Sequence, residues 1–113
     1  MDNPGGIKNI KSEDQFFDVI KSGLVYVLLY RFGDINCEVA CDMIKYFPER
    51  YPDLKVYRLD VNEVMEVAMG YRIQEFPTSL IFRNGKMKGS ITGVKEVDIR
   101  HLIEGVQAGP KKK

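Results

Sequence analysis

The sequence predicts one α/β domain in which a mixed β-sheet carries helices on both faces. Short apolar runs alternate along the chain with segments of helical periodicity, a pattern typical of strands joined by crossover helices. In the run Leu24–Tyr30 the odd-numbered and the even-numbered positions are all apolar, as expected of a central strand that is covered on both sides. The dipeptide Asn84-Gly85 between two strand-like segments is a strong signal for a β-hairpin, which adds antiparallel strands to the sheet.

A strand and a helix are expected before this central strand. Residues 7–10 are a candidate for a short strand. The helix should begin at Ser12, because Ser12 and Gln15 match a Ser-x-x-Gln capping box, and Gly23 should end the element. Three apolar residues share the inward face of this helix: Phe16, Val19 and Ile20.

A second helix should begin near Asp34, directly after the central strand. Pro48 must break or bend it, because proline has no N–H to donate and its ring collides with the preceding turn. Apolar residues recur at helical spacing along this segment, and we expect them to face the core: Val39, Ala40, Met43, Ile44 and Phe47.

The second half of the chain repeats the alternation and then adds the hairpin. We expect a strand over residues 56–61, a helix over 63–71, and two strands over 79–83 and 88–92. A last helix with a poorly marked N-terminus follows, and its apolar face consists of Ile99, Leu102, Ile103 and Val106. Strands separated by crossover helices should be parallel, whereas the hairpin strands are antiparallel.

Length and composition indicate an ordinary globular domain. The chain has 113 residues, of which 44% are apolar and 29% charged, and this balance excludes a disordered protein. The 17 Lys and Arg against 16 Asp and Glu give a net charge of +1, which argues against nucleic acid as a partner. The longest apolar run has seven residues, far fewer than the roughly 20 of a membrane helix, so no membrane partner is expected either.

The two ends of the chain lack structural patterns. We expect a domain over residues 7–107 between a flexible segment, 1–6, and a flexible basic tail, 108–113, which ends in Lys111, Lys112 and Lys113. The start has neither the basic nor the apolar segment of a signal peptide, and two cysteines are too few for a secreted disulfide framework. A cytoplasmic location is therefore expected, with the nucleus as the alternative.

Cys37 and Cys41 are the residues with the most distinctive chemistry. On a helix, their i, i+4 spacing places the Cβ atoms about 5–6 Å apart, whereas a disulfide needs roughly 3.5–4.5 Å, so a bond between them would be strained and easily reduced. Cys37 would be the third residue of a helix capped by Asp34. The positive helix end favours its thiolate, while Asp34 and Glu38 oppose it, so we expect a pKa near the ordinary value.

No metal or other cofactor is expected. Cys37, Cys41 and His101 are the possible zinc ligands, but a structural zinc site normally takes four and His101 belongs to a distant helix. No second titratable group stands near Asp34 in sequence, so general acid–base catalysis has no support.

Several motifs together resemble the thioredoxin family. The order of elements matches, and Cys37 stands at the start of the helix after the central strand. The matching motifs are Phe76-Pro77-Thr78 before a strand, Phe82-x-Asn84-Gly85, and the glycines Gly85, Gly89 and Gly93. Residues 29–93 can be laid on an animal thioredoxin without a gap. The resemblance implies the thioredoxin fold and a cis peptide bond before Pro77.

The resemblance departs from the family pattern at the active site. Thioredoxins carry Trp-Cys-Gly-Pro-Cys, where this chain reads Gly33-Asp34-Ile35-Asn36-Cys37. The position of the attacking cysteine therefore holds Asp34, and only the resolving position, Cys37, keeps a thiol. The buried aspartate of the family falls on Leu28.

Two branches of the thioredoxin fold that work by binding show local likeness. Leu29-Tyr30-Arg31 and residues 51–56 are similar to phosducin-like proteins. Arg31-Phe32-Gly33 is similar to the small thioredoxin-like proteins of the spliceosome. Neither likeness implies a specific function.

Two functional hypotheses follow. The first is a protein-binding or adaptor module that has lost the dithiol site and holds a protein or extended peptide by main-chain pairing. Its surface would be the family's substrate-binding ridge: Phe32, Gly33, Asp34, Ile35, Asn36, Glu75, Phe76, Pro77 and Gly93. The alternative is a thiol–disulfide oxidoreductase that acts through Cys37 with Cys41, or through Cys37 alone. The sequence does not indicate the oligomeric state.

Overall fold

The computed structural model describes residues 6–109, in which five strands form one mixed sheet in the order β1-β3-β2-β4-β5. The strands are β1 (Ile7–Asn9), β2 (Leu24–Tyr30), β3 (Leu54–Asp60), β4 (Thr78–Arg83) and β5 (Lys86–Thr92). β1, β3 and β2 are parallel, while β4 and β5 run antiparallel to their neighbours. This arrangement confirms the predicted α/β class with its mixed sheet.

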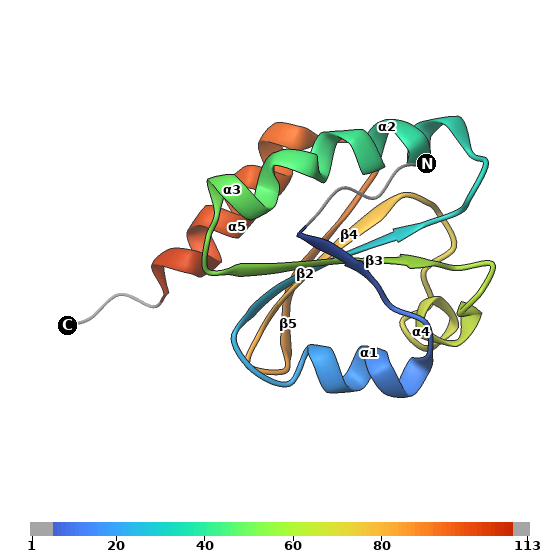
Figure 1. The fold of residues 1–113 in the computed structure, drawn as a ribbon, viewed down its shortest axis with the longest axis horizontal. Helices are drawn as coiled ribbons and strands as arrows, with labels where there is room; N and C mark the ends of the chain where they lie inside the picture. Colours follow the sequence, from blue (N-terminus) through green and yellow to red (C-terminus); the bar gives the residue numbers. More distant parts are fainter. Residues whose placement is uncertain (1–5, 110–113) are drawn as a thin grey trace.

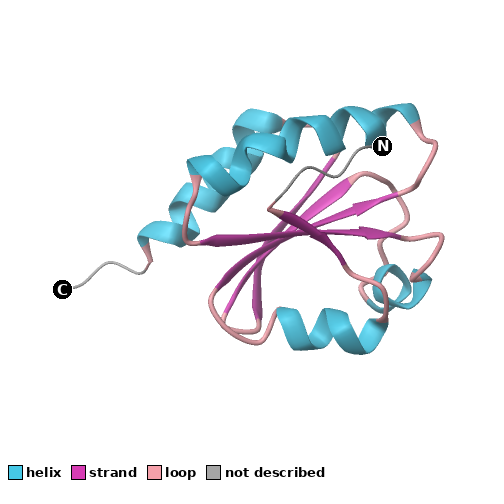
Figure 2. Cartoon of the chain, viewed as in Figure 1, coloured by secondary structure: helices cyan, strands magenta, loops and turns pink. Residues whose placement is uncertain are grey.

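Helices cover both faces of the sheet. They are α1 (Glu13–Val19), α2 (Ile35–Met43), α3 (Phe47–Arg50), α4 (Met65–Gly70) and α5 (Glu96–Ala108), with a 3₁₀ turn, η1 (Ile44–Tyr46), between α2 and α3. Figures 1 and 2 show α2, α3 and α5 on one side of the sheet and α1 and α4 on the other. None of the helices in the described residues is both long and apolar enough to span a bilayer.

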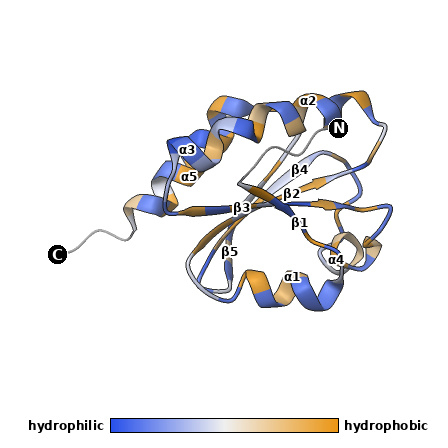
Figure 3. Ribbon diagram, viewed as in Figure 1, coloured by the Kyte–Doolittle hydropathy of each residue, from blue (hydrophilic) through white to orange (hydrophobic). Residues whose placement is uncertain are grey.

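The central strand β2 contributes to a separate core on each face, because successive side chains of a strand point to opposite sides. Tyr26, Leu28 and Tyr30 pack toward α2 and α5. The alternate residues of β2 pack toward α1 and α4: Val25, Val27 and Leu29. Figure 3 shows the matching amphipathic pattern, with hydrophobic and hydrophilic stretches alternating along α1 and α2.

The interruption of the second helix at Pro48 is confirmed. α2 ends at Met43, the chain continues as the 3₁₀ turn, and Pro48 lies in the first turn of α3. A proline is tolerated there because the first N–H groups of a helix have no intrahelical acceptor.

The predicted inward face of α2 is wrong in one respect. Val39 is 49% exposed and Met43 is only half-buried. The buried face consists of Cys37, Ala40, Cys41, Ile44 and Phe47. Compared with the prediction, α2 is therefore rotated about its axis, so that both thiols, which are small and weakly polar, pack against the sheet.

The hairpin between β4 and β5 forms as predicted. Asn84 and Gly85 have φ angles of 51° and 86°, both in the left-handed region, as a type I′ turn requires. The Asn84 side chain also accepts a hydrogen bond from the Gly23 N–H at 2.8 Å, which joins this turn to the start of β2.

The predictions about the chain ends fall largely outside the described residues. This applies to residues 1–5 and to residues 110–113, which include the three lysines. Within the described residues, the first strand begins at Ile7 and the last helix ends at Ala108.

Candidate functional site

The register of the sheet brings the predicted ridge to one end of the sheet. Leu29 of β2 pairs with Thr78 of β4, so the loop after β2 adjoins the turn before β4. The Arg31 guanidinium lies over the Phe76 ring, 5.0 Å from its centroid. The Phe76–Pro77 peptide bond is cis, and the Pro77 carbonyl accepts a hydrogen bond from the Gly93 N–H at 2.8 Å.

The ridge carries exposed apolar side chains. Phe32 is 61% exposed and Ile35 is 74% exposed, while Phe76 is half-buried. Gly33 has a φ of 91°, and the tight turn that it forms is closed by a hydrogen bond from the Asp34 N–H to the Arg31 carbonyl. Asn36 and Glu75 are exposed, Asp34 and Gly93 are half-buried, and Pro77 is buried. The three ridge segments therefore form one surface of mixed character around the start of α2.

Asp34 caps the N-terminus of α2, as predicted. Its extended backbone precedes the helix, and its Oδ1 accepts a hydrogen bond from the Cys37 N–H at 3.1 Å. The bond satisfies one of the N–H groups that a helix start leaves without an intrahelical acceptor. The structural role of Asp34 explains a carboxylate here without any catalytic function.

The cap leads to a prediction about stability. Asp34→Ala should lower the free energy of unfolding by about 0.5–2 kcal/mol, whereas Asp34→Asn, which keeps the acceptor oxygen, should remain close to the unsubstituted protein. Urea denaturation followed by circular dichroism measures both values. Equal losses in the two variants would mean that the charge of Asp34, and not its capping bond, stabilises the helix.

Cys37 is fully buried beneath the loop that follows β2. Its Sγ accepts a hydrogen bond from the Arg31 N–H at 3.3 Å. Burial raises the pKa of Cys37 to about 11, the Asp34 charge raises it further, and the Arg31 N–H opposes the shift. The prediction of an ordinary pKa is therefore wrong, because it weighed charges near in sequence and not the loss of hydration in the folded state.

Cys41 lies one turn further along α2, on the same buried face. Both cysteines are free thiols. Burial raises the pKa of Cys41, and the charge of Arg58 together with a hydrogen bond from its side chain opposes that rise. The two thiols thus differ in surroundings: a backbone N–H contacts the first, and a guanidinium contacts the second.

Arg58 is a site residue that the sequence analysis missed. It lies on β3 and is only 7% exposed. Its Nε donates to Asn9 Oδ1 at 2.8 Å, and its guanidinium lies over the Tyr30 ring, 5.2 Å from the centroid. Arg58 follows Val56 by two residues, so the sequence alone places a charged side chain on the inward face of a strand. Only the packed structure places that side chain beside Cys41.

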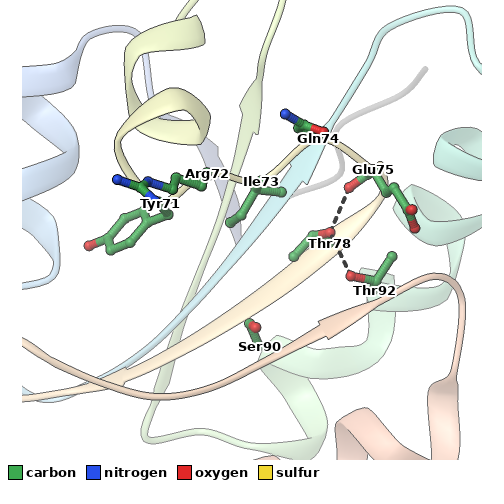
Figure 4. A pocket seen from close by; sticks show the side chains of 8 residues that line it. All are labelled: Tyr71, Arg72, Ile73, Gln74, Glu75, Thr78, Ser90 and Thr92. Atoms are coloured by element: carbon green, nitrogen blue, oxygen red, sulfur yellow. Dashed lines mark hydrogen bonds between the residues drawn. The ribbon is translucent and has the colours of Figure 1, made fainter.

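A polar groove of about 460 Å³ lies beside the ridge (Figure 4). It lies between the segment after α4 and strands β4 and β5, and its lining residues are Tyr71, Arg72, Ile73, Gln74, Glu75, Thr78, Ser90 and Thr92. The Thr78 hydroxyl donates to the Glu75 carbonyl at 2.7 Å. Neither cysteine lines this groove, so it is separate from the thiols.

The candidate metal ligands are not brought together. His101 is exposed on α5, whereas both cysteines are buried on α2. Among residues 6–109, no group of three or more His, Cys, Asp or Glu side chains is arranged to hold a metal ion.

Comparison with known proteins gives a consistent result. Residues 10–105 match the family model described as Thioredoxin. Thioredoxin-1 of Saccharomyces cerevisiae is 32% identical over 98 residues, which are 86% of this chain and 95% of that protein. A solved thioredoxin of Plasmodium falciparum has a TM-score of 0.81 at 24% identity, covering 87% of this chain and 97% of that one. A thioredoxin of Nicotiana alata has a TM-score of 0.83 at 22% identity, covering 93% and 96%.

These relatives contradict the first functional hypothesis, an adaptor with a degenerate site in which residues 34–37 replace Cys-x-x-Cys. The similarity to thioredoxins extends over nearly the whole chain, and it favours the alternative hypothesis of an oxidoreductase. The adaptor hypothesis rested on the residues that replace family groups at Gly33, Asp34 and Leu28, and these differences are local. A second thiol, Cys41, lies four residues after Cys37 on the same buried helix face.

Proposed function

Because the chain belongs to the thioredoxin family, we propose that it is a protein thiol–disulfide oxidoreductase that acts through Cys37, with Cys41 as the second thiol. The observation that carries the proposal is the placement of two free thiols on one face of α2. The first of them lies under the loop that adjoins the cis Pro77 turn.

The proposed reaction reduces a disulfide in a substrate protein. Because Cys37 is fully buried, the loop after β2 must first move away from its sulfur. The Cys37 thiol then loses its proton, and the thiolate attacks one substrate sulfur; a mixed disulfide forms, and the other substrate sulfur leaves as a thiolate that takes up a proton. Cys41 then loses its proton and attacks Cys37 Sγ, which releases the second substrate thiol. The substrate gains two electrons and the protein loses two, and an external dithiol returns the protein to its reduced state.

The helix geometry requires the first turn of α2 to move during the second step. Cβ atoms at i, i+4 lie about 5–6 Å apart in a helix, which exceeds the roughly 3.5–4.5 Å of a disulfide. The capping bond from Asp34 to the Cys37 N–H holds this turn in place. A disulfide formed here would be strained and therefore readily reduced, which suits a protein that returns to the dithiol form.

The ridge around Cys37 supports a protein as the substrate. Phe32 and Ile35 present apolar surface to solvent, and the turn before β4 brings the Phe76 ring under the Arg31 guanidinium of the loop after β2. We propose that an extended segment of the substrate lies along this turn by main-chain pairing. A reducing compartment, the cytoplasm, is the location in which such a dithiol would stay reduced.

The buried position of Cys37 predicts a strong pH dependence of its exchange. Because the pKa of Cys37 is raised to about 11 from an ordinary 9.0, its thiolate fraction should rise about tenfold for each pH unit between 7 and 10. Reduced protein, freed of small thiols, is mixed with excess insulin, and the remaining protein thiols are counted after acid quenching. The exchange rate should follow the thiolate fraction.

Two outcomes would contradict these expectations separately. A protein that leaves insulin unchanged at every pH would disprove the proposed function. A rate that is already constant from pH 7 to 8 would mean that the attacking thiol is not a buried one with a raised pKa.

The raised pKa of Cys37 also has a consequence for stability. The contribution of the neutral Cys37 thiol to stability is fully present below pH 9 and is lost as the pH rises toward 11.

A further inference from the structure

Arg58 is a buried cation on the same side of the sheet as the two thiols. On β3 it shares the parity of Leu54 and Val56, which belong to the core beneath α2 and α5. The register places Arg58 opposite Leu28 on β2 and Asn9 on β1. Its side chain therefore lies between the sheet and α2, where Cys41 is buried.

The contacts of Arg58 orient its guanidinium. Nε donates to Asn9 Oδ1 at 2.8 Å, and the planar group stacks on the Tyr30 ring at 5.2 Å. Arg58 also hydrogen-bonds the Cys41 thiol, where its charge favours the thiolate. A guanidinium can make these three contacts at once because its N–H groups form a rigid planar fork, whereas a lysine ammonium is a point charge that cannot stack in this way.

We infer that Arg58 is a positioning residue for the exchange reaction: it holds the Cys41 sulfur and stabilises its thiolate when Cys41 attacks the mixed disulfide at Cys37. This inference rests on the proposed function, because it assigns a role in the second step of that reaction. The step breaks the bond between Cys37 and the substrate, forms the Cys37–Cys41 bond, and releases the substrate sulfur as a thiolate.

The charge of Asp42, the next residue on α2, opposes the ionisation of Cys41. Tyr26 and Tyr30 on β2 and Cys37 on α2 are the other titratable groups near it, and a Cys41 thiolate raises the pKa of each of them. Burial also opposes the ionisation of Cys41. Arg58 opposes these effects from β3, so its removal should leave Cys41 protonated over a wider pH range and slow the second step, while the attack by Cys37 on substrate is not affected directly.

The test separates the two steps of the reaction. Arg58→Met keeps the length of the side chain without its charge, Arg58→Lys restores the charge, and Arg50→Met on the exposed α3 is the matched control. Reduced protein is mixed with excess insulin, quenched with acid and examined by mass spectrometry. We expect Arg58→Met to accumulate the mixed disulfide and to resolve it at least tenfold more slowly, with partial rescue by Arg58→Lys and no change in Arg50→Met. A folded Arg58→Met variant that resolves at the normal rate overturns the inference.

A second measurement does not depend on turnover. In the Cys37→Ser protein, the absorbance of the Cys41 thiolate at 240 nm is followed against pH, with and without Arg58→Met. The titration should move to higher pH when Arg58 is replaced, and an unchanged titration overturns the inference even if the protein has no exchange activity. If Arg58→Met does not fold, Asn9→Ala removes the Nε acceptor and should slow resolution and shift the titration in the same direction; no change in either would again overturn it.

Discussion

Replacing Cys37 with serine should abolish exchange with disulfide substrates, reducing the rate at least 100-fold to that of the solution without protein. A serine hydroxyl cannot form the mixed disulfide, and Cys41 lies one turn deeper along α2, away from the loop that adjoins the Pro77 turn. The fold should survive, because the Arg31 N–H that contacts the sulfur can donate to the serine oxygen instead. The measurement is the loss of insulin disulfides with an excess of dithiol as reductant.

Two further variants serve as controls for the Cys37→Ser result. Val39→Ser makes a substitution of similar size on the same helix, at a side chain that is 49% exposed, and should leave the rate unchanged. Cys41→Ser should permit the first attack but trap the mixed disulfide. Exchange that persists in folded Cys37→Ser would show that Cys37 is not the attacking thiol.

Replacing Phe47 with alanine should lower the free energy of unfolding by about 3–5 kcal/mol. The Phe47 ring is fully buried and packs edge-to-face on Tyr26, Tyr46 and Tyr51, with centroid distances of 5.3, 5.1 and 5.8 Å. Its removal leaves a cavity where α3 meets the sheet and removes three aromatic contacts at once. Urea denaturation of the variant measures the loss.

The matched control is a second phenylalanine. Phe32 is 61% exposed in the loop after β2, and Phe32→Ala should change the free energy of unfolding by less than about 0.5 kcal/mol. Similar losses in the two variants would contradict the core that the structure assigns to this face.

Phe32→Ala also tests the ridge, because it should weaken the interaction with substrate without altering stability.

Local features of this chain could be predicted from the sequence because their causes lie within a few residues. Asp34 caps α2 since its carboxylate reaches the N–H three residues on. Pro48 interrupts the helix because it lacks an N–H, and Asn84-Gly85 forms the hairpin turn because both residues accept a positive φ. The order of such signals also sufficed to predict the mixed sheet and its parallel and antiparallel parts.

The candidate site could be predicted only in part. Cys37, Cys41 and the ridge residues could be predicted from the sequence, and the register of β2 and β4 brings the ridge segments together. The predicted adaptor function is wrong, because it rested on the residues that replace the family's active-site groups. The extent of the similarity to thioredoxins, over residues 10–105, outweighs that local difference.

Only the tertiary structure decided the chemistry of the thiols. The orientation of α2 about its axis determines their burial, because it places Val39 in solvent and both sulfurs against the sheet. The raised pKa of Cys37 follows from this burial, and the contact of Cys41 with Arg58 joins residues 17 positions apart in sequence. Capping and turn formation depend on neighbours along the chain, whereas hydration and the field at a buried sulfur depend on atoms that only folding brings near.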